Sequence, residues 1–169
     1  MGFWRQARAI ALLPGNVTIA IPLLILLLGS GPEWLWGLDG PPAVLAGALG
    51  AALVVAGFLL WLWTVRLFVA VGRGTLAPWD PTTELVIEGP YAHVRNPMIS
   101  AVAAVLAGEA ILLGSPGIAL LAALFPLVNH AYFVFAEEPG LERRFGAVYA
   151  AYSRAVPRWL PRLRPWRPA

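Results

Sequence analysis

The sequence predicts an all-α membrane protein: a polytopic transmembrane helical bundle of about four spans, followed by a C-terminal amphipathic cytoplasmic helix. The first observation is composition, because 59% of the 169 residues are hydrophobic, 12% are charged, and the mean hydropathy is +0.72. These values exceed what a soluble domain of this length needs for its core. The second observation is the length of the apolar runs, since about 20 helical residues cross a hydrocarbon layer of about 30 Å.

The apolar runs give four predicted spans: Ala9 to Leu28, Pro42 to Val65, Met98 to Leu113 and Ile118 to Ala136. The first span starts directly after Arg5 and Arg8 and lacks a small-residue cleavage site before a soluble domain. We therefore expect an anchor rather than a cleaved signal peptide. Pro14 and Pro22 should kink this span or shorten its regular part.

Residues 1–71, with the first two spans, are interpreted as a membrane scaffold without chemistry of its own. The second span contains overlapping pairs of small residues four apart, which let helix backbones approach closely: Ala46 with Gly50, and Gly47 with Ala51. Residues 72–169 are interpreted as the functional core. There a helical hairpin over residues 97–136 turns at the four residues 114–117.

The distribution of charge predicts the orientation in the membrane. The loop between the first two spans carries only Glu33 and Asp39, whereas arginines flank the other ends of the spans and fill the tail. By the positive-inside rule, both termini and the central loop face the cytoplasm. We expect an integral, multi-pass protein of a bacterial or archaeal cell membrane. Its net charge of +3 is then balanced by anionic lipid headgroups, not by nucleic acid.

The absence of cysteine excludes a disulfide framework and a thiolate metal site. No metal site is expected from the remaining ligand types either, because no HxxxH or HExxH spacing occurs. Phosphate-binding glycine motifs and a nucleophile elbow are also missing from the sequence.

The tail begins with a predicted amphipathic helix over residues 140–152. Its apolar positions follow helical spacing along one face: Leu141, Phe145, Val148, Tyr149 and Tyr152. The helix is too short and too charged to span, so we expect it to lie along the cytoplasmic interface or to pack over the bundle. The segment after it is basic, aromatic and interrupted by prolines, which suits an interface.

Polar residues gather in two stretches, and the first precedes the third span. Gly89 and Pro90 form a turn, and Pro97 restrains Asn96 to an extended backbone and suits the first helical turn. The unpaired N–H groups at this helix start, with Arg95 beside them, would hold a carboxylate or a phosphate. The alternative is an ordinary helix cap with an arginine that reaches the headgroups.

The second stretch lies at the end of the fourth span, which the hairpin brings to the same cytoplasmic end. His130 and Glu137 share one helical face with Phe133 and Val134, whereas Glu138 points about 100° away. The following residue, Pro139, removes a donor and strains the helix at position 138.

Two carboxylates beside this break are well placed to accept hydrogen bonds from the hydroxyl or ammonium groups of a ligand. Alternatively, both glutamates end the span in solvent or pair with Arg143 and Arg144, and His130 is structural. Glu109 lies within the third span, with Asn129 and His130 as candidate partners on the fourth.

The order and spacing of these stretches resemble those of the isoprenylcysteine carboxyl methyltransferase and phospholipid methyltransferase superfamily. GPYAHVRNP at residues 89–97 is followed by a hydrophobic hairpin, by EEPGLERRFG at residues 137–146, and then by Tyr149, Tyr152 and VPR at residues 156–158. The resemblance covers roughly residues 72 to 162. Two positions depart from the usual pattern: Asn96 replaces a histidine, and residues 98–100 replace Tyr-x-Gly.

The resemblance implies a site for S-adenosylmethionine at the cytoplasmic surface and a lipid-like or small hydrophobic methyl acceptor that arrives from the bilayer. Carried over by position, the cofactor-binding residues are Tyr91, His93, Arg95, Asn96 and Pro97 on one wall and His130, Glu137 and Glu138 on the other. Tyr149 and Tyr152, with Arg158, would form a lid. Arg95 and His130 would belong to the catalytic centre.

The acceptor stays open at this point: a phospholipid amine, a small hydrophobic thiol and a quinone-like molecule all fit. Two other functional classes remain as alternatives. One is an NADPH-dependent membrane reductase related to sterol reductases, and the other is a non-enzymatic scaffold. The sequence gives no oligomeric state.

Overall fold

The fold is taken from a computed structural model that describes residues 11–29, 31–72 and 83–168, with side chains from residue 15 onward. Every regular element in this part of the chain is helical. In chain order the elements are η1 (Ala11–Ala20), α2 (Ile21–Leu28), η2 (Trp34–Gly37), α3 (Gly40–Ala70), η3 (Gly89–Ala92), α4 (Pro97–Leu113), α5 (Pro116–Tyr132), η4 (Phe133–Glu137) and α6 (Glu138–Ala155).

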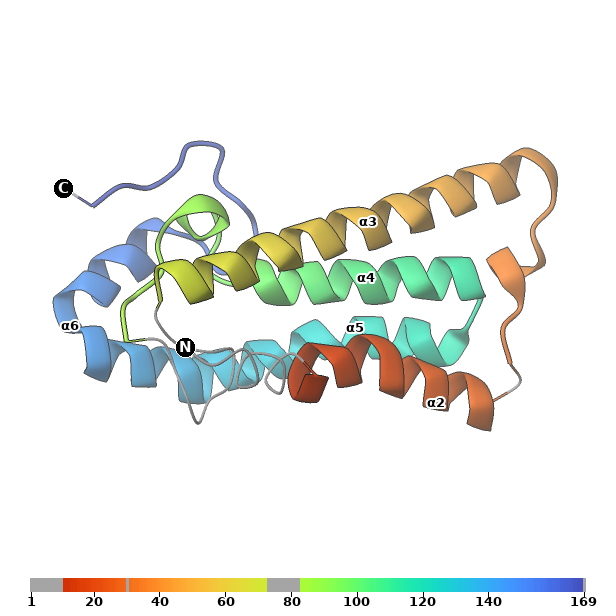
Figure 1. Cartoon of the computed structure of the whole chain (residues 1–169), viewed down its shortest axis with the longest axis horizontal. Coiled ribbons are helices and arrows are strands. Elements are labelled where there is room, and N and C mark those ends of the chain that lie inside the picture. Colours follow the sequence, from red (N-terminus) through yellow and green to blue (C-terminus); the bar gives the residue numbers. More distant parts are fainter. Residues whose placement is uncertain (1–10, 30, 73–82, 169) are drawn as a thin grey trace.

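The long helices lie side by side, with α4 between α3 and α5 and with α2 alongside α5 (Figure 1). Two helical stretches are long and apolar enough to cross a membrane: α3, and the continuous stretch Pro116–Ala155. Gly15–Leu28 and Pro97–Leu113 are shorter apolar helices. The prediction of an all-helical membrane bundle is confirmed.

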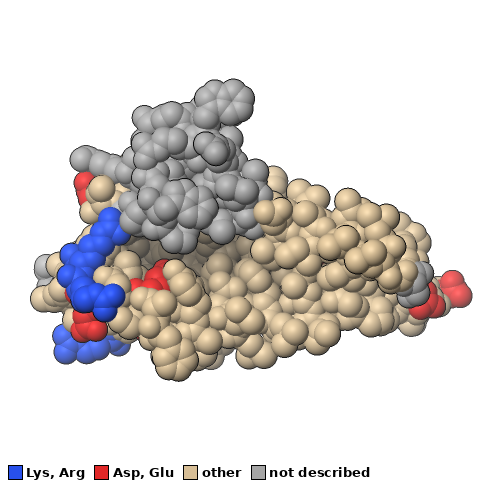
Figure 2. All heavy atoms as spheres, turned by 90° about the horizontal axis from the view of Figure 1, so that it is seen from below, with Lys and Arg blue, Asp and Glu red and all other residues tan. Residues whose placement is uncertain are grey.

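Most charged side chains of the described residues lie toward the two ends of this bundle. Arginine side chains gather at the α6 end, and acidic atoms mark the opposite tip, where the loop before α3 carries Glu33 and Asp39 (Figure 2). Tan atoms make up most of the described surface between the two ends in this view. On α3, Val44 and Leu45 are 70% and 71% exposed. An apolar surface of this kind is suited to a lipid environment.

The α3–α4 contact depends on glycines. A Cβ atom on Gly57 would lie 2.7 Å from the carbonyl oxygen of Ala101, and one on Gly108 would lie 2.6 Å from that of Gly50. Thr64, seven residues after Gly57, is also fully buried. Its hydroxyl is satisfied within α3, because Oγ1 donates to the carbonyl of Trp61 at 2.7 Å. The two backbones therefore approach as closely as they can.

Of the small residues predicted to let helices approach closely, Gly50 meets α4, whereas the pair of Gly47 and Ala51 does not. Ala51 is exposed, and Gly47 faces Leu35. The buried residues of α3 are instead Gly50, Gly57 and Thr64, which are seven positions apart, and both glycines meet α4. This spacing keeps them on one side of α3 over several turns.

The backbone of α5 passes into α6 through one wide turn, η4, in which the N–H of Glu138 bonds to the carbonyl of Phe133 five residues earlier. Pro139 explains the turn, because its ring cannot fit against the carbonyl four residues before it and it has no N–H to donate. The predicted strain ahead of Pro139 is confirmed, but the helix does not end at Ala136.

The expected amphipathic helix is part of α6, which begins at Glu138 and breaks at Gly146, where φ is 53° and ψ is −130°. The break reorients the last turns, so Tyr149 and Tyr152 are buried with Val156 while Val148 is 55% exposed. The prediction that Val148 shares one face with these two tyrosines was therefore wrong. A regular helix was assumed there, and a glycine in the left-handed region interrupts it.

Candidate functional site

The site lies where the loop before α4 meets the C-terminal strap, which we define as residues 156–168. Three backbone hydrogen bonds join them. The N–H of Arg95 donates to the carbonyl of Pro157 at 2.9 Å, the N–H of Arg162 to the carbonyl of His93 at 3.0 Å, and the N–H of Trp166 to the carbonyl of Ala92 at 2.9 Å. Segments 62 to 74 residues apart in the sequence therefore lie side by side (Figure 1).

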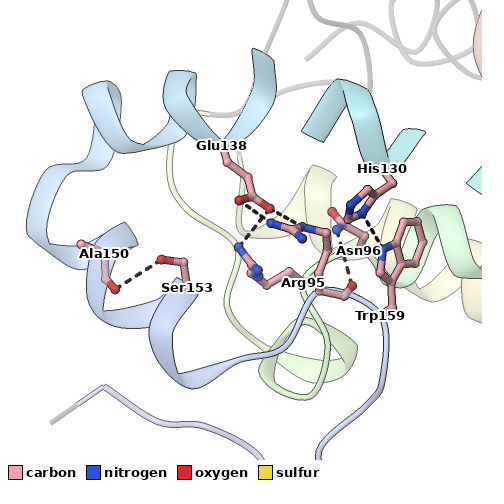
Figure 3. A network of polar contacts seen from close by, with 8 residues as sticks. Arg95, Asn96, His130, Glu138, Ala150, Ser153 and Trp159 are labelled. Carbon is pink, nitrogen blue, oxygen red and sulfur yellow. Dashed lines mark hydrogen bonds and ion pairs between the residues drawn. The ribbon is translucent and has the colours of Figure 1, made fainter. Parts of the chain in front are cut away.

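Glu138 is clamped between two arginines (Figure 3). Arg158 donates from Nε to Oε1 at 2.7 Å and from Nη2 to Oε2 at 2.9 Å, and Nη1 of Arg95 lies 3.0 Å from Oε1. Burial alone would raise the pKa of Glu138, but the hydrogen bond from Arg158 and the charges of both arginines outweigh burial and lower it. Glu138 is therefore ionised and already paired, rather than an exposed helix end.

Glu137 is the opposite case. No side chain in the described ranges donates a hydrogen bond to its carboxylate, although the residue is half-buried. Burial, and secondarily the charge of Glu138, raise the pKa of Glu137 to about 7. Two adjacent glutamates thus differ in kind, because one completes the protein's own ion-pair network and the other is left available.

A second unsatisfied group belongs to the same network. Nε of Arg95 is buried and has no hydrogen-bond partner among the described residues. An unpaired buried donor is costly and calls for a specific explanation. The charges of Glu138, Arg95 and Glu137 all act on the pKa of Tyr149, which burial raises, so the phenol lies close to all three.

The aromatic residues fasten α6 to the loop. Tyr152 donates from its hydroxyl to the carbonyl of Tyr91 at 2.8 Å, and the buried ring of Tyr91 packs on Phe68 of α3 with centroids 5.6 Å apart. Tyr149, Tyr152 and Val156 form one buried cluster. The structure therefore brings the predicted lid tyrosines to the predicted first wall.

The polar side chains of the loop face the strap. His93 donates from Nδ1 to the carbonyl of Arg162 at 2.7 Å, since a carbonyl can only accept, and Asn96 donates a long 3.5 Å bond to the carbonyl of Arg158. Pro97 is fully buried at the start of α4, and the cap residue Asn96 makes no side-chain capping bond there. The atoms of His93 and Asn96 that bond to the strap hold it in place.

His130 contacts the strap instead of the glutamates. Its Nδ1 accepts a hydrogen bond from Nε1 of Trp159 at 3.1 Å (Figure 3). The Trp159 ring also packs on Phe133, with centroids 5.9 Å apart. Because Nδ1 accepts, the neutral imidazole carries its proton on Nε2, which leaves one N–H for another partner.

The predicted partners of Glu109 are wrong. Asn129 donates to the carbonyl of Phe125 at 2.8 Å, and His130 bonds to Trp159. Oε2 of Glu109 is buried without a hydrogen-bond partner among the described residues. The pairing is wrong because the residues lie at different depths of the hairpin: Glu109 is near the turn that joins α4 to α5, whereas Asn129 and His130 are at the far end of α5.

Comparison with known proteins assigns the family. The profile described as phospholipid methyltransferase matches residues 45–148, which is more than half of the chain and includes most of α3, all of α4 and α5, and both glutamates. The chain belongs to the phospholipid methyltransferase family. Searches of curated proteins and of solved structures gave no match.

In this phospholipid methyltransferase family member, four residues that close the site follow the matched range: Tyr149, Tyr152, Arg158 and Trp159. The contact of Trp159 with His130 was not predicted, and no spacing in the sequence signals it. Arg158 was predicted as a lid residue, but its bidentate pairing with Glu138 was not. A basic, aromatic tail was the only available signal.

Changing Tyr152 to phenylalanine should destabilise the family member by about 1–2 kcal/mol, because the buried carbonyl of Tyr91 loses its donor while the ring keeps its packing. The melting temperature of the protein in detergent measures the effect. Tyr132→Phe serves as the control, since Tyr132 is 47% exposed. Equal melting temperatures for the two variants would show that the Tyr152 hydroxyl does not hold the loop.

Proposed function

We propose that this family member transfers a methyl group from S-adenosylmethionine to a lipid-like or small hydrophobic acceptor at the cytoplasmic membrane face. The observation that carries the proposal is the Glu137 carboxylate, which has no side-chain donor among the described residues and lies beside the ion-pair network of Glu138, in a chain of the phospholipid methyltransferase family. The family supports methyltransferase chemistry, and the site supports the choice of cofactor.

The residues fit the charges of that cofactor. Glu137 is the acceptor for its ammonium group or ribose hydroxyls, and the unpaired Nε of Arg95 is a donor for its carboxylate. The start of α4, which Asn96 leaves without a side-chain cap, adds backbone N–H groups and the positive end of the helix dipole. When bound, S-adenosylmethionine supplies an electrophilic methyl group on its sulfonium.

The protein's task is then to bind, orient and exclude water. Arg95 and Glu137 fix the two ends of the amino-acid moiety, and Glu138 with Arg158 positions Arg95. The Nε2–H of His130, which the bond from Trp159 leaves unused, would be a donor to the ligand, and Tyr149 with Tyr91 would line the site. Alignment of a nucleophile in such a dry pocket provides much of the acceleration, so no dedicated general base is required.

The membrane orientation supports an acceptor that arrives from the bilayer. Arginines gather at the α6 end, which is also the end of the site, and the charged atoms seen at the opposite tip in this view are acidic (Figure 2). Under the positive-inside rule the site and both termini face the cytoplasm in a multi-pass protein. A lipid-like molecule would then reach the site along the apolar faces of the bundle.

Calorimetric titration of the detergent-purified protein with S-adenosylhomocysteine tests the proposal, with NADPH as the matched control. We expect saturable binding of S-adenosylhomocysteine alone. Binding of NADPH alone would assign the chain to membrane reductases. If neither ligand binds, in detergent or in lipid nanodiscs, the protein is a non-enzymatic scaffold and the proposal is contradicted.

A further inference from the structure

The C-terminal strap carries an exposed face that the proposed activity does not use. Leu160 and Leu163 are 81% and 98% exposed, and Arg164 and Arg167 beside them are exposed as well. Neither arginine makes an ion pair or a side-chain hydrogen bond with the described residues. Fully exposed leucines interleaved with arginines are unfavourable in water and suit a bilayer interface.

This face is held in place rather than free to collapse onto the protein. The backbone of the strap is fixed at Arg162 and Trp166 by bonds to His93 and Ala92, and the Trp166 ring packs edge-on against Tyr152 with centroids 5.6 Å apart. The inward-facing side chains thus anchor the strap, and the leucines and the two arginines are presented outward.

The strap also lies at the level where hydrocarbon gives way to headgroups. The loop that it covers rests on the last apolar turns of α3, since a Cβ on Gly89 would lie 3.0 Å from Leu67 and 3.3 Å from Trp63. The apolar run of α3 ends there, and Arg66 is already exposed. Residues of the strap are therefore close to the cytoplasmic leaflet of a bilayer that surrounds α3.

We propose that the outer face of the strap, formed by Leu160, Leu163, Arg164 and Arg167, docks onto the anionic headgroups of the cytoplasmic leaflet. The leucines enter the interface and the arginines pair with lipid phosphates. This contact also steadies Arg158 and Trp159, which belong to the same strap and hold Glu138 and His130. The inference does not depend on the identity of the cofactor.

Because the sequence contains no cysteine, a single introduced cysteine can carry a spin label at a chosen position of the full chain. A nitroxide on Leu163→Cys is examined in nanodiscs of phosphatidylcholine alone and in nanodiscs that also contain phosphatidylglycerol. Collision rates with a water-soluble nickel chelate and with oxygen report the depth of the label. Leu124→Cys, on an exposed position of α5, gives the hydrocarbon reference in both discs.

We expect phosphatidylglycerol to reduce collisions of the label with the nickel chelate, and we expect Arg164→Gln with Arg167→Gln to reverse the reduction. Each arginine should contribute about fivefold to the preference for the anionic surface. Arg143→Gln with Arg154→Gln removes the same charge from exposed positions of α6 and should have no effect.

Three results would overturn the inference. One is equal accessibility of Leu163 in both kinds of disc, and another is protection that survives the Arg164 and Arg167 changes. The third is protection in neutral discs that appears only on addition of RNA, which would assign the face to nucleic acid.

Discussion

Replacing Glu137 by glutamine is expected to abolish measurable binding of S-adenosylhomocysteine while making the ligand-free protein more stable at pH 8. The buried carboxylate has a pKa of about 7 in the fold, against an ordinary value of 4.5. The folded state therefore binds an extra proton between these pH values, so stability falls as the pH rises through this window. Above pH 7 the ionised, buried Glu137 lowers the free energy of unfolding by about 3 kcal/mol at most, and a neutral glutamine removes this destabilisation.

The same group should make ligand binding depend on pH. An ammonium group requires the ionised form of Glu137, so the affinity of the wild-type protein should fall about tenfold per pH unit below pH 7. Near pH 6.5, binding should release protons, which calorimetry detects by comparing buffers of different ionisation enthalpy. Affinity that does not change with pH in the wild type would contradict the assigned role of Glu137.

Glu138→Gln is the matched comparison and should have the opposite effect on stability. It leaves Arg95 and Arg158 without their shared carboxylate in a site where these side chains are 13% and 23% exposed. We expect a loss of about 1–3 kcal/mol, together with weaker binding because Arg95 is no longer positioned. Since the pKa of Glu138 is lowered, its contribution is present above the ordinary pKa and disappears as the pH falls through the folded value.

The melting temperatures of the two variants at pH 8, measured side by side in detergent, decide the matter. A rise for Glu137→Gln and a fall for Glu138→Gln would show that one glutamate serves the ligand and its neighbour serves the fold. Equal shifts in the same direction would show that the two residues share one role.

Gly108→Leu should prevent α3 and α4 from packing. A Cβ at this position already lies 2.6 Å from the carbonyl oxygen of Gly50 and 2.7 Å from Val54, so a leucine forces the backbones apart. Overpacking a closely fitted contact costs about 1–3 kcal/mol, and displacement of two helices costs more. We expect no monodisperse protein on size-exclusion chromatography in detergent.

Ala51→Leu is the control for this change, because Ala51 is on α3 but exposed. It should give well-folded protein with an unchanged elution volume. Recovery of folded Gly108→Leu, or loss of folded Ala51→Leu, would show that the α3–α4 contact runs along a different stripe.

Several features of this protein follow from its sequence alone. The apolar runs determined the helices and their membrane character, since hydrocarbon admits only backbones whose hydrogen bonds are satisfied within the segment. Pro139 determined the irregular turn before it, and Gly89, Pro90 and Pro97 determined the loop that ends at α4. These are local effects, because each depends on residues within about one turn.

Only the tertiary structure decided which carboxylate is available. A regular helix predicted the angle between Glu137 and Glu138 but not their partners, since Arg158 and Arg95 lie 20 and 43 positions away in the sequence and meet Glu138 only in the folded arrangement of strap, loop and α6. The break at Gly146 likewise turned α6 so that Tyr152 meets Tyr91. Side-chain pairings of this range depend on how helices pack and on register, which residue spacing along one chain does not encode.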